Sequence, residues 1–170
     1  MKVSIVIPIK DEAENIEALA NELTKVMDSQ TWLWKCFWVD DGSTDQTLTI
    51  LQTICVEGSN HSYFSLGKTF GQSASLLAGF KEANGHIIAT LDGDGQNDPA
   101  DLPTLINIVL SGQADMAIGY RTIRQDNIIR KLSSRIGNLF RNMITGANIT
   151  DVGCARPGSL CQTIPGSVDC

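Results

Sequence analysis

Short apolar runs alternate with segments of helical periodicity along the first 120 residues, and this alternation constrains the fold more than any other feature. The runs that read as strands are 3–7, 35–39, 61–66, 87–91 and 114–119. Apolar residues at helical spacing predict helices over 11–28, 48–55, 70–84, 99–110 and 128–144, with Ser43 or Thr44 capping the second. Strands joined through helices by short loops predict an α/β fold, a mostly parallel sheet with helices on both faces.

Polar side chains follow three of the five expected strands. Ligands of a parallel α/β sheet bind outside the carboxyl ends of its strands, so we expect these side chains to converge on one edge. Acidic groups gathered there suit a cation together with a ligand rich in hydroxyl and N–H groups, such as a ribose and a nucleobase. The first strand ends near Pro8, Asp11 and Glu12, the second at Asp40 and Asp41, and the fourth at Asp92 and Asp94.

The fourth expected strand stops abruptly at Asp92-Gly93-Asp94-Gly95. Two carboxylates one residue apart on a glycine-rich turn can point their oxygens at one small volume, where they repel unless a cation neutralises them. Hard oxygen ligands of this kind suit Mg²⁺ or Mn²⁺ bridged to a substrate phosphate. A solvated Asp/Gly turn between a strand and a helix is the alternative, and the stretch alone favours neither.

Charge is unevenly distributed along the chain. The net charge of −6 argues against a nucleic-acid partner, while all six arginines lie at or after Arg121. Cations beside the apolar side of the helix expected within 124–144 fit an anionic membrane surface or a lipid phosphate. A core-packing helix with a solvated basic face explains the same pattern equally well.

Other well-known sites are excluded by their spacing. Gly67-Lys68-Thr69 has Ser62 where a phosphate-binding loop needs its first glycine, and Gly93-Asp94-Gly95 lacks the third glycine of a dinucleotide fingerprint. Neither His61 nor His86 stands in a nucleophile motif, so we expect both to be structural or solvated. The N-terminus does not read as a signal peptide and no apolar run is long enough to span a membrane, which favours a cytoplasmic protein.

Five motifs, in order, resemble the family 2 glycosyltransferases, and more narrowly the polyprenyl-phosphate glycosyltransferases related to dolichyl-phosphate mannosyltransferase. The resemblance covers roughly residues 1–154. It implies the nucleotide-diphospho-sugar transferase (GT-A) fold and favours the metal reading of Asp92 and Asp94. The motifs are Ile7-Pro8 with Asp11-Glu12, Asp40-Asp41-Gly42-Ser43-Thr44-Asp45, Phe70-Gly71-Gln72, Asp92-x-Asp94-x-Gln96-Asn97-Asp98-Pro99 and Gly119-Tyr120-Arg121.

The resemblance also implies residue roles. Asp94 would bind the divalent ion, Mg²⁺ or Mn²⁺, that holds the donor diphosphate, and Asp92 would hold the ribose and the water shell of the metal. Asp41, with Pro8 and Glu12, would line the pocket of the nucleobase and ribose. Gln96 would lie near the sugar or the acceptor, and Arg121 would contact phosphate.

The function implied is inverting, metal-dependent transfer of a sugar from a UDP- or GDP-linked donor to a polyprenyl phosphate. The protein would lie peripherally at the inner face of the cell membrane, contacting it through the basic helix within 124–144. A saccharide acceptor is one alternative, and a non-catalytic nucleotide-sugar binding module is another. Residues 1–154 would form a catalytic domain that is incomplete at its C-terminus, followed by an irregular tail over 155–170, because the sequence from Ala155 onward no longer resembles the family.

Overall fold

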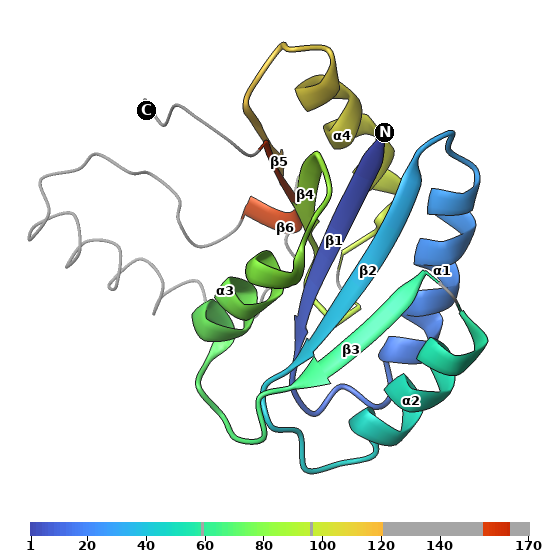
Figure 1. Cartoon of the computed structure of the whole chain (residues 1–170), viewed down its shortest axis with the longest axis vertical. Coiled ribbons are helices and arrows are strands. Elements are labelled where there is room, and N and C mark those ends of the chain that lie inside the picture. Colours follow the sequence, from blue (N-terminus) through green and yellow to red (C-terminus); the bar gives the residue numbers. More distant parts are fainter. Residues whose placement is uncertain (59, 96, 121–154, 164–170) are drawn as a thin grey trace, which may run out of the picture.

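A six-stranded, mostly parallel sheet forms the centre of the protein in a computed structural model (Figure 1). The structure describes residues 1–58, 60–95, 97–120 and 155–163. The strands are β1 (Lys2–Ile9), β2 (Leu33–Asp40), β3 (His61–Ser65), β4 (Ile87–Thr90), β5 (Met116–Tyr120) and β6 (Ala155–Thr163), in the spatial order β3-β2-β1-β4-β6-β5. β1 pairs in parallel with β2 and β4, and β2 with β3, whereas β6 runs antiparallel between β4 and β5.

Helices cover both faces of this sheet, as the alternating pattern predicted. The helices are α1 (Ile16–Asp28), α2 (Thr47–Glu57), α3 (Gln72–Glu82) and α4 (Leu102–Leu110), with a 3₁₀ turn, η1 (Pro99–Asp101), directly before α4. In Figure 1, α3 lies on the side of the sheet opposite α1 and α2. None of the helices in the described ranges is long and apolar enough to cross a bilayer.

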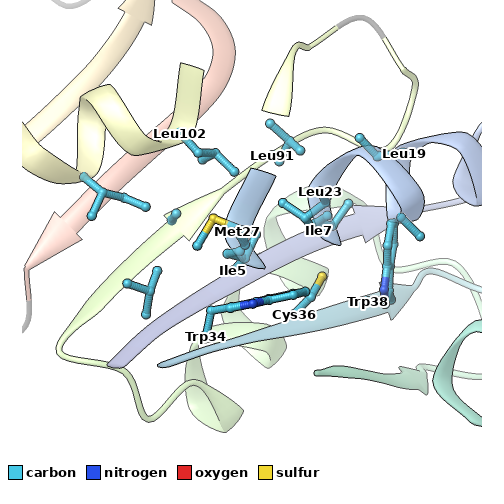
Figure 2. Packing of buried hydrophobic residues seen from close by; sticks show 14 of the residues in the cluster. Ile5, Ile7, Leu19, Leu23, Met27, Trp34, Cys36, Trp38, Leu91 and Leu102 are labelled. Carbon is cyan, nitrogen blue, oxygen red and sulfur yellow. The ribbon is translucent and has the colours of Figure 1, made fainter. Parts of the chain in front are cut away.

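The central strand β1 is buried on both faces, which explains its continuous apolar sequence. Ile5 and Ile7 pack with Leu23 and Met27 of α1 in the larger core cluster, shown in Figure 2. On the other face Val6 belongs to a smaller cluster with residues of α3. Complete burial of an isoleucine or leucine side chain stabilises the fold by roughly 1.5–3 kcal/mol, so these alternating residues fix which face of β1 meets which helix.

The helix α1 starts later than its periodicity predicted. The chain from residue 11 to residue 15 forms a loop instead, beginning at Asp11, whose φ of 53° lies in the left-handed region. The backbone N–H of Asp11 donates to Ser43 Oγ at 2.9 Å, and Asp11 Oδ1 accepts from the N–H of Thr44 at 2.7 Å. These contacts tie the loop after β1 to the loop after β2. Neither Ser43 nor Thr44 caps α2, because α2 begins only at Thr47.

The expectation of an irregular segment from residue 155 is wrong for Ala155–Thr163, which forms β6. The regular antiparallel ladder with β4 involves only four pairs, from Thr90↔Leu160 to Ile87↔Thr163. Pro157 and Gly158 fall where the register with β5 shifts between Ile118 and Tyr120. A proline is tolerated at such an irregularity because no ladder hydrogen bond is required of it. Pairing with two neighbouring strands, rather than local sequence, therefore accounts for this strand.

Candidate nucleotide-sugar site

A cavity of about 400 Å³ opens at the carboxyl edge of the sheet. It is lined by all five of the residues that sequence reasoning assigned to a donor and its metal and that the structure describes. A site of this size is within the range of pockets that bind small molecules. Its lining consists of Pro8, Ile9, Lys10, Glu12, Asp41, Gln72, Ser75, Asp92, Gly93 and Asp94.

Pro8 can occupy the end of β1 because the pairing of β1 with β4 ends at Val6 and Thr90, before it reaches Pro8. The carbonyl of Val6 accepts from the N–H of Leu91 on the β4 side, and the carbonyl of Ile9 accepts from the N–H of Asp41 on the β2 side. Backbone groups alternate along a strand, so the nitrogen of Pro8 faces the β4 side, beyond the last paired residue Thr90. The missing N–H costs no ladder bond there, and the strand reaches the cavity rim.

Asp41, directly after β2, binds the backbone at the start of α3. Its Oδ1 accepts from the N–H of Phe70 at 2.7 Å and its Oδ2 from the N–H of Gly71 at 2.9 Å. The residue is 5% exposed, so this buried carboxylate has both oxygens satisfied by N–H groups. Asp41 thus fixes where α3 begins, and each oxygen keeps a further lone pair with which it can accept from a ligand.

Asp40, the residue before Asp41, has a structural role. Asp40 is fully buried, and its carboxylate accepts from Ser65 Oγ at 2.6 Å and from the N–H of Ser43 at 3.0 Å. These contacts join the ends of β2 and β3 and shape the turn at Gly42. Of the two adjacent aspartates, only Asp41 lines the cavity.

Glu12 reaches the cavity from the loop between β1 and α1. Its N–H donates to Thr47 Oγ1 at 2.9 Å, and its Oε2 accepts from Asn15 Nδ2 at 2.7 Å. The next residue, Ala13, donates its N–H to Asp45 Oδ2 at 3.2 Å. Hydrogen bonds from Thr47 and Ala13 lower the pKa of the exposed Asp45 carboxyl from its ordinary value. The loop carrying Glu12 is therefore bound to Thr47, the first residue of α2, and to Asp45 just before that helix.

Asp92 and Asp94 follow β4 and are both partly buried at the cavity. Asp92 Oδ1 accepts from Gln72 Nε2 at 3.0 Å. Between the two acids, Gly93 lies so close to β1 that a Cβ there would overlap Ile9 Cγ2. Gly95 has a φ of 68°, which favours glycine. The glycines thus let the turn lie against the end of β1 and present both acids to the same cavity.

The donor set fits a hard divalent cation that shares its coordination with a ligand. In the described ranges, no three side chains of His, Cys, Asp or Glu are grouped closely enough to hold a metal by themselves. Two aspartates supply oxygen ligands, and Mg²⁺ and Mn²⁺ characteristically take the rest from phosphate and water. Asp98 is not part of this set, because its Oδ1 accepts from the N–H of Ala100 and caps η1.

Two expected site residues, Gln96 and Arg121, lie outside the described residues, as does the basic segment 124–144. Arg121 directly follows Tyr120, the last residue of β5. β4 and β5 both run antiparallel to β6, so they point the same way, and Tyr120 lies toward the carboxyl edge, where its partner Ala155 begins β6. The connection between Tyr120 and Ala155 therefore leaves and re-enters the sheet at the edge that holds the cavity.

Sequence reasoning missed three polar residues that line the cavity, namely Lys10, Gln72 and Ser75. Gln72 belongs to the Phe70-Gly71-Gln72 motif, which was recognised but given no role. Lys10 stands between Pro8 and Asp11 in the first polar cluster and is the one cation of the lining among the described residues. Ser75 follows Gln72 on α3 and is fully buried, a position that only the packing of α3 on the sheet reveals.

Comparison with known sequences agrees with this geometry. A family model described as glycosyl transferase family 2 matches residues 4–156. The dodecaprenyl-phosphate galacturonate synthase of Rhizobium johnstonii is 36% identical over 157 residues, which are 91% of this chain and 46% of that protein. The undecaprenyl-phosphate 4-deoxy-4-formamido-L-arabinose transferase of Yersinia pestis is 35% identical over 154 residues, or 90% of this chain and 47% of the relative. The chain thus spans about half the length of these curated relatives.

Solved structures share the fold. Mannosyl-3-phosphoglycerate synthase from Rubrobacter xylanophilus superimposes with a TM-score of 0.68 at 16% identity, covering 96% of this chain and 53% of its own. A mannosyltransferase from Pyrobaculum calidifontis, solved with GDP-Man and Mn²⁺, gives a TM-score of 0.59 at 18% identity, covering 73% and 36%. These likenesses confirm the expected GT-A fold. The family model matches most of the length of this chain, and the cavity of the chain carries the acids of that family's motifs. The chain therefore belongs to glycosyl transferase family 2.

Proposed function

We propose that this chain carries the donor-binding part of a glycosyltransferase that moves a sugar from a nucleotide-diphospho-sugar to a polyprenyl phosphate. The observation that carries the proposal is the meeting of Asp41, Asp92 and Asp94 at one cavity of about 400 Å³, although they follow two different strands. The names of the curated relatives, both transferases or synthases of polyprenyl-phosphate sugars, support the choice of acceptor.

Each lining residue receives a role in this proposal. Asp94 ligates a divalent cation, Mg²⁺ or Mn²⁺, that binds the donor diphosphate, and Asp92 faces the ribose and the water shell of that cation. Asp41, Pro8 and Glu12 line the nucleobase and ribose. The Mn²⁺ and GDP-Man in the Pyrobaculum calidifontis mannosyltransferase support such a pairing of cation and donor.

The chemistry follows from the charges. When the bond between the anomeric carbon and the diphosphate oxygen breaks, negative charge builds on the leaving diphosphate. A bound divalent cation supplies electrostatic stabilisation of that charge. Arg121, next along the chain from the carboxyl end of β5, contributes donors to the same phosphates, and Gln96 faces the sugar or the acceptor.

The acceptor needs little activation. A polyprenyl phosphate is already anionic at neutral pH, so its oxygen attacks the anomeric carbon without a strong general base. Attack from the face opposite the leaving diphosphate inverts the anomeric configuration. Residues 1–154 form the catalytic domain in this proposal, and the basic segment 124–144 contacts the lipid phosphate at the inner membrane surface.

The test is a transfer assay with the full chain, a polyprenyl phosphate in detergent micelles, and UDP- or GDP-linked sugars with Mg²⁺ or Mn²⁺. The proposal expects a glycosylated lipid phosphate that forms with wild type and is lost with Asp94→Ala. Transfer to a saccharide but not to the lipid phosphate would contradict the acceptor. Donor binding without any transfer would instead identify a binding module.

A further inference from the structure

The three residues Phe70, Gly71 and Gln72 contact both acidic sides of the cavity. The N–H groups of Phe70 and Gly71 donate to the two carboxylate oxygens of Asp41 at 2.7 and 2.9 Å. The next side chain donates from Gln72 Nε2 to Asp92 Oδ1 at 3.0 Å. One turn therefore joins the aspartate that follows β2 to the aspartate that follows β4.

The position of this turn is fixed from two directions. Gly71 has a φ of 96°, a left-handed conformation that sets the direction in which α3 leaves the turn. α3 is held close to the sheet, since a Cβ on Gly79 would overlap Val6 Cγ1 of β1. The amide of Gln72, in the first turn of α3, is thus presented to Asp92 by a helix that packs closely against the sheet.

The hydrogen bond to Asp92 has a chemical consequence. An aspartate side chain beside a glycine-rich turn can rotate, and rotation would carry its oxygens away from a cation or ribose. With Oδ1 held by Gln72, the remaining lone pairs of Asp92 keep one orientation toward the cavity. Partners of this kind, which orient the groups around a metal, are worth about 10–100-fold in metal affinity.

We propose that Gln72 is a positioning residue, which orients Asp92 toward the ribose and the water shell of the divalent cation. This inference rests on the proposed function, because it assigns Gln72 a task at the same site. The competing explanation is that Gln72 only stabilises the start of α3. That explanation predicts a change in folding stability and no specific change in metal binding.

The variant Gln72→Met separates the two explanations, because methionine keeps the length of the side chain and removes the donating amide. Free Mn²⁺ is measured by electron paramagnetic resonance during titration of the full chain, with and without UDP or GDP. We expect Gln72→Met to bind Mn²⁺ and the nucleotide about tenfold more weakly, the lower end of the range for such partners. Ser73→Ala, at the next exposed position of α3, is the matched control and should bind like wild type.

The decisive experiment repeats the Gln72→Met substitution in a protein that already carries Asp92→Ala. A residue that acts through Asp92 has nothing left to orient there, so Gln72→Met should cause no further loss of Mn²⁺ affinity. An undiminished loss in that background, or an unchanged affinity in the single variant, would overturn the inference. Thermal unfolding of each variant verifies that it is folded. If wild type itself binds neither Mn²⁺ nor nucleotide, the proposed function fails instead, so the two failures are distinguishable.

Discussion

Asp41 Oδ2 accepts the N–H of Gly71 at 2.9 Å, a contact between residues 30 positions apart that joins the end of β2 to the start of α3. The same carboxylate accepts from Phe70 through its other oxygen. Asp41, which our proposal assigns to the donor, is therefore also a structural anchor. Substitutions at Asp41 are expected to change folding stability as well as ligand binding.

The substitution Asp41→Asn tests this dual role. The side-chain amide keeps one accepting oxygen but turns an NH₂ group toward a backbone N–H, leaving a buried donor unpaired. We expect the free energy of unfolding to fall by about 1–3 kcal/mol, measured by urea denaturation. Glu82→Gln, at the exposed end of α3, serves as the control and should be near neutral. Equal stability of Asp41→Asn and wild type would show that these hydrogen bonds contribute little.

A second prediction concerns the approach of Gly93 to Ile9. A Cβ at residue 93 would overlap Ile9 Cγ2, and the branched side chain of Ile9 is 3% exposed and has little room to move. We expect Gly93→Ala to destabilise the fold by about 1–3 kcal/mol, as overpacking does. The measurement is again urea denaturation.

The cause of that cost can be isolated with Ile9→Ala, which removes the obstructing methyl group. In this background Gly93→Ala should cost clearly less than in wild type, so the two substitutions should be non-additive. Strict additivity would mean that the overlap with Ile9 is not the source of the strain.

The third prediction follows from the hydrogen bonds of His61. Its Nδ1 accepts from Trp38 Nε1 at 3.1 Å, and its Nε2 lies 2.9 Å from Thr24 Oγ1, which donates to the carbonyl of Ala20. This arrangement suits the neutral ring with its proton on Nε2. Burial lowers the pKa of His61, and the charge of Asp28 opposes that shift only partly.

Because the folded pKa lies below the unfolded value of about 6.5, the unfolded chain binds the proton first as the pH falls. The contribution of His61 to stability is therefore complete above about pH 6.5 and is lost at lower pH. Urea denaturation at about pH 7.5 and about pH 5.5 should show a smaller loss for His61→Gln than for wild type. An equal loss in both would assign the pH dependence to other groups. Because the pKa of Asp45 is lowered, this carboxyl titrates below the range between about pH 5.5 and about pH 7.5.

Much of the fold could be predicted from local pattern. The apolar runs at 3–7, 35–39 and 87–91 form β1, β2 and β4 because a parallel strand covered on both faces must be apolar throughout. Their carboxyl ends share one edge, so the expectation that Asp41, Asp92 and Asp94 would converge needed no tertiary information beyond the sheet itself.

The errors arose where distant contacts override local preference. The helical periodicity after Asp11 was real, but hydrogen bonds to Ser43 and Thr44 hold its first residues in a loop. β6 contains Pro157 and Gly158, and its strand conformation depends on lying between β4 and β5. Gln72 drew no prediction because an exposed glutamine at a helix start is unremarkable until its partner Asp92 is known.

The most direct test of the site is isothermal titration calorimetry of UDP- and GDP-linked sugars on wild type and Asp94→Ala, with and without Mn²⁺. We predict that wild type binds one of these donors, that removing Mn²⁺ weakens binding, and that Asp94→Ala loses this dependence on the metal. If wild type binds no nucleotide-sugar, or if Asp94→Ala binds it as tightly and with the same response to Mn²⁺, the assignment of this cavity to a metal-bound donor is contradicted.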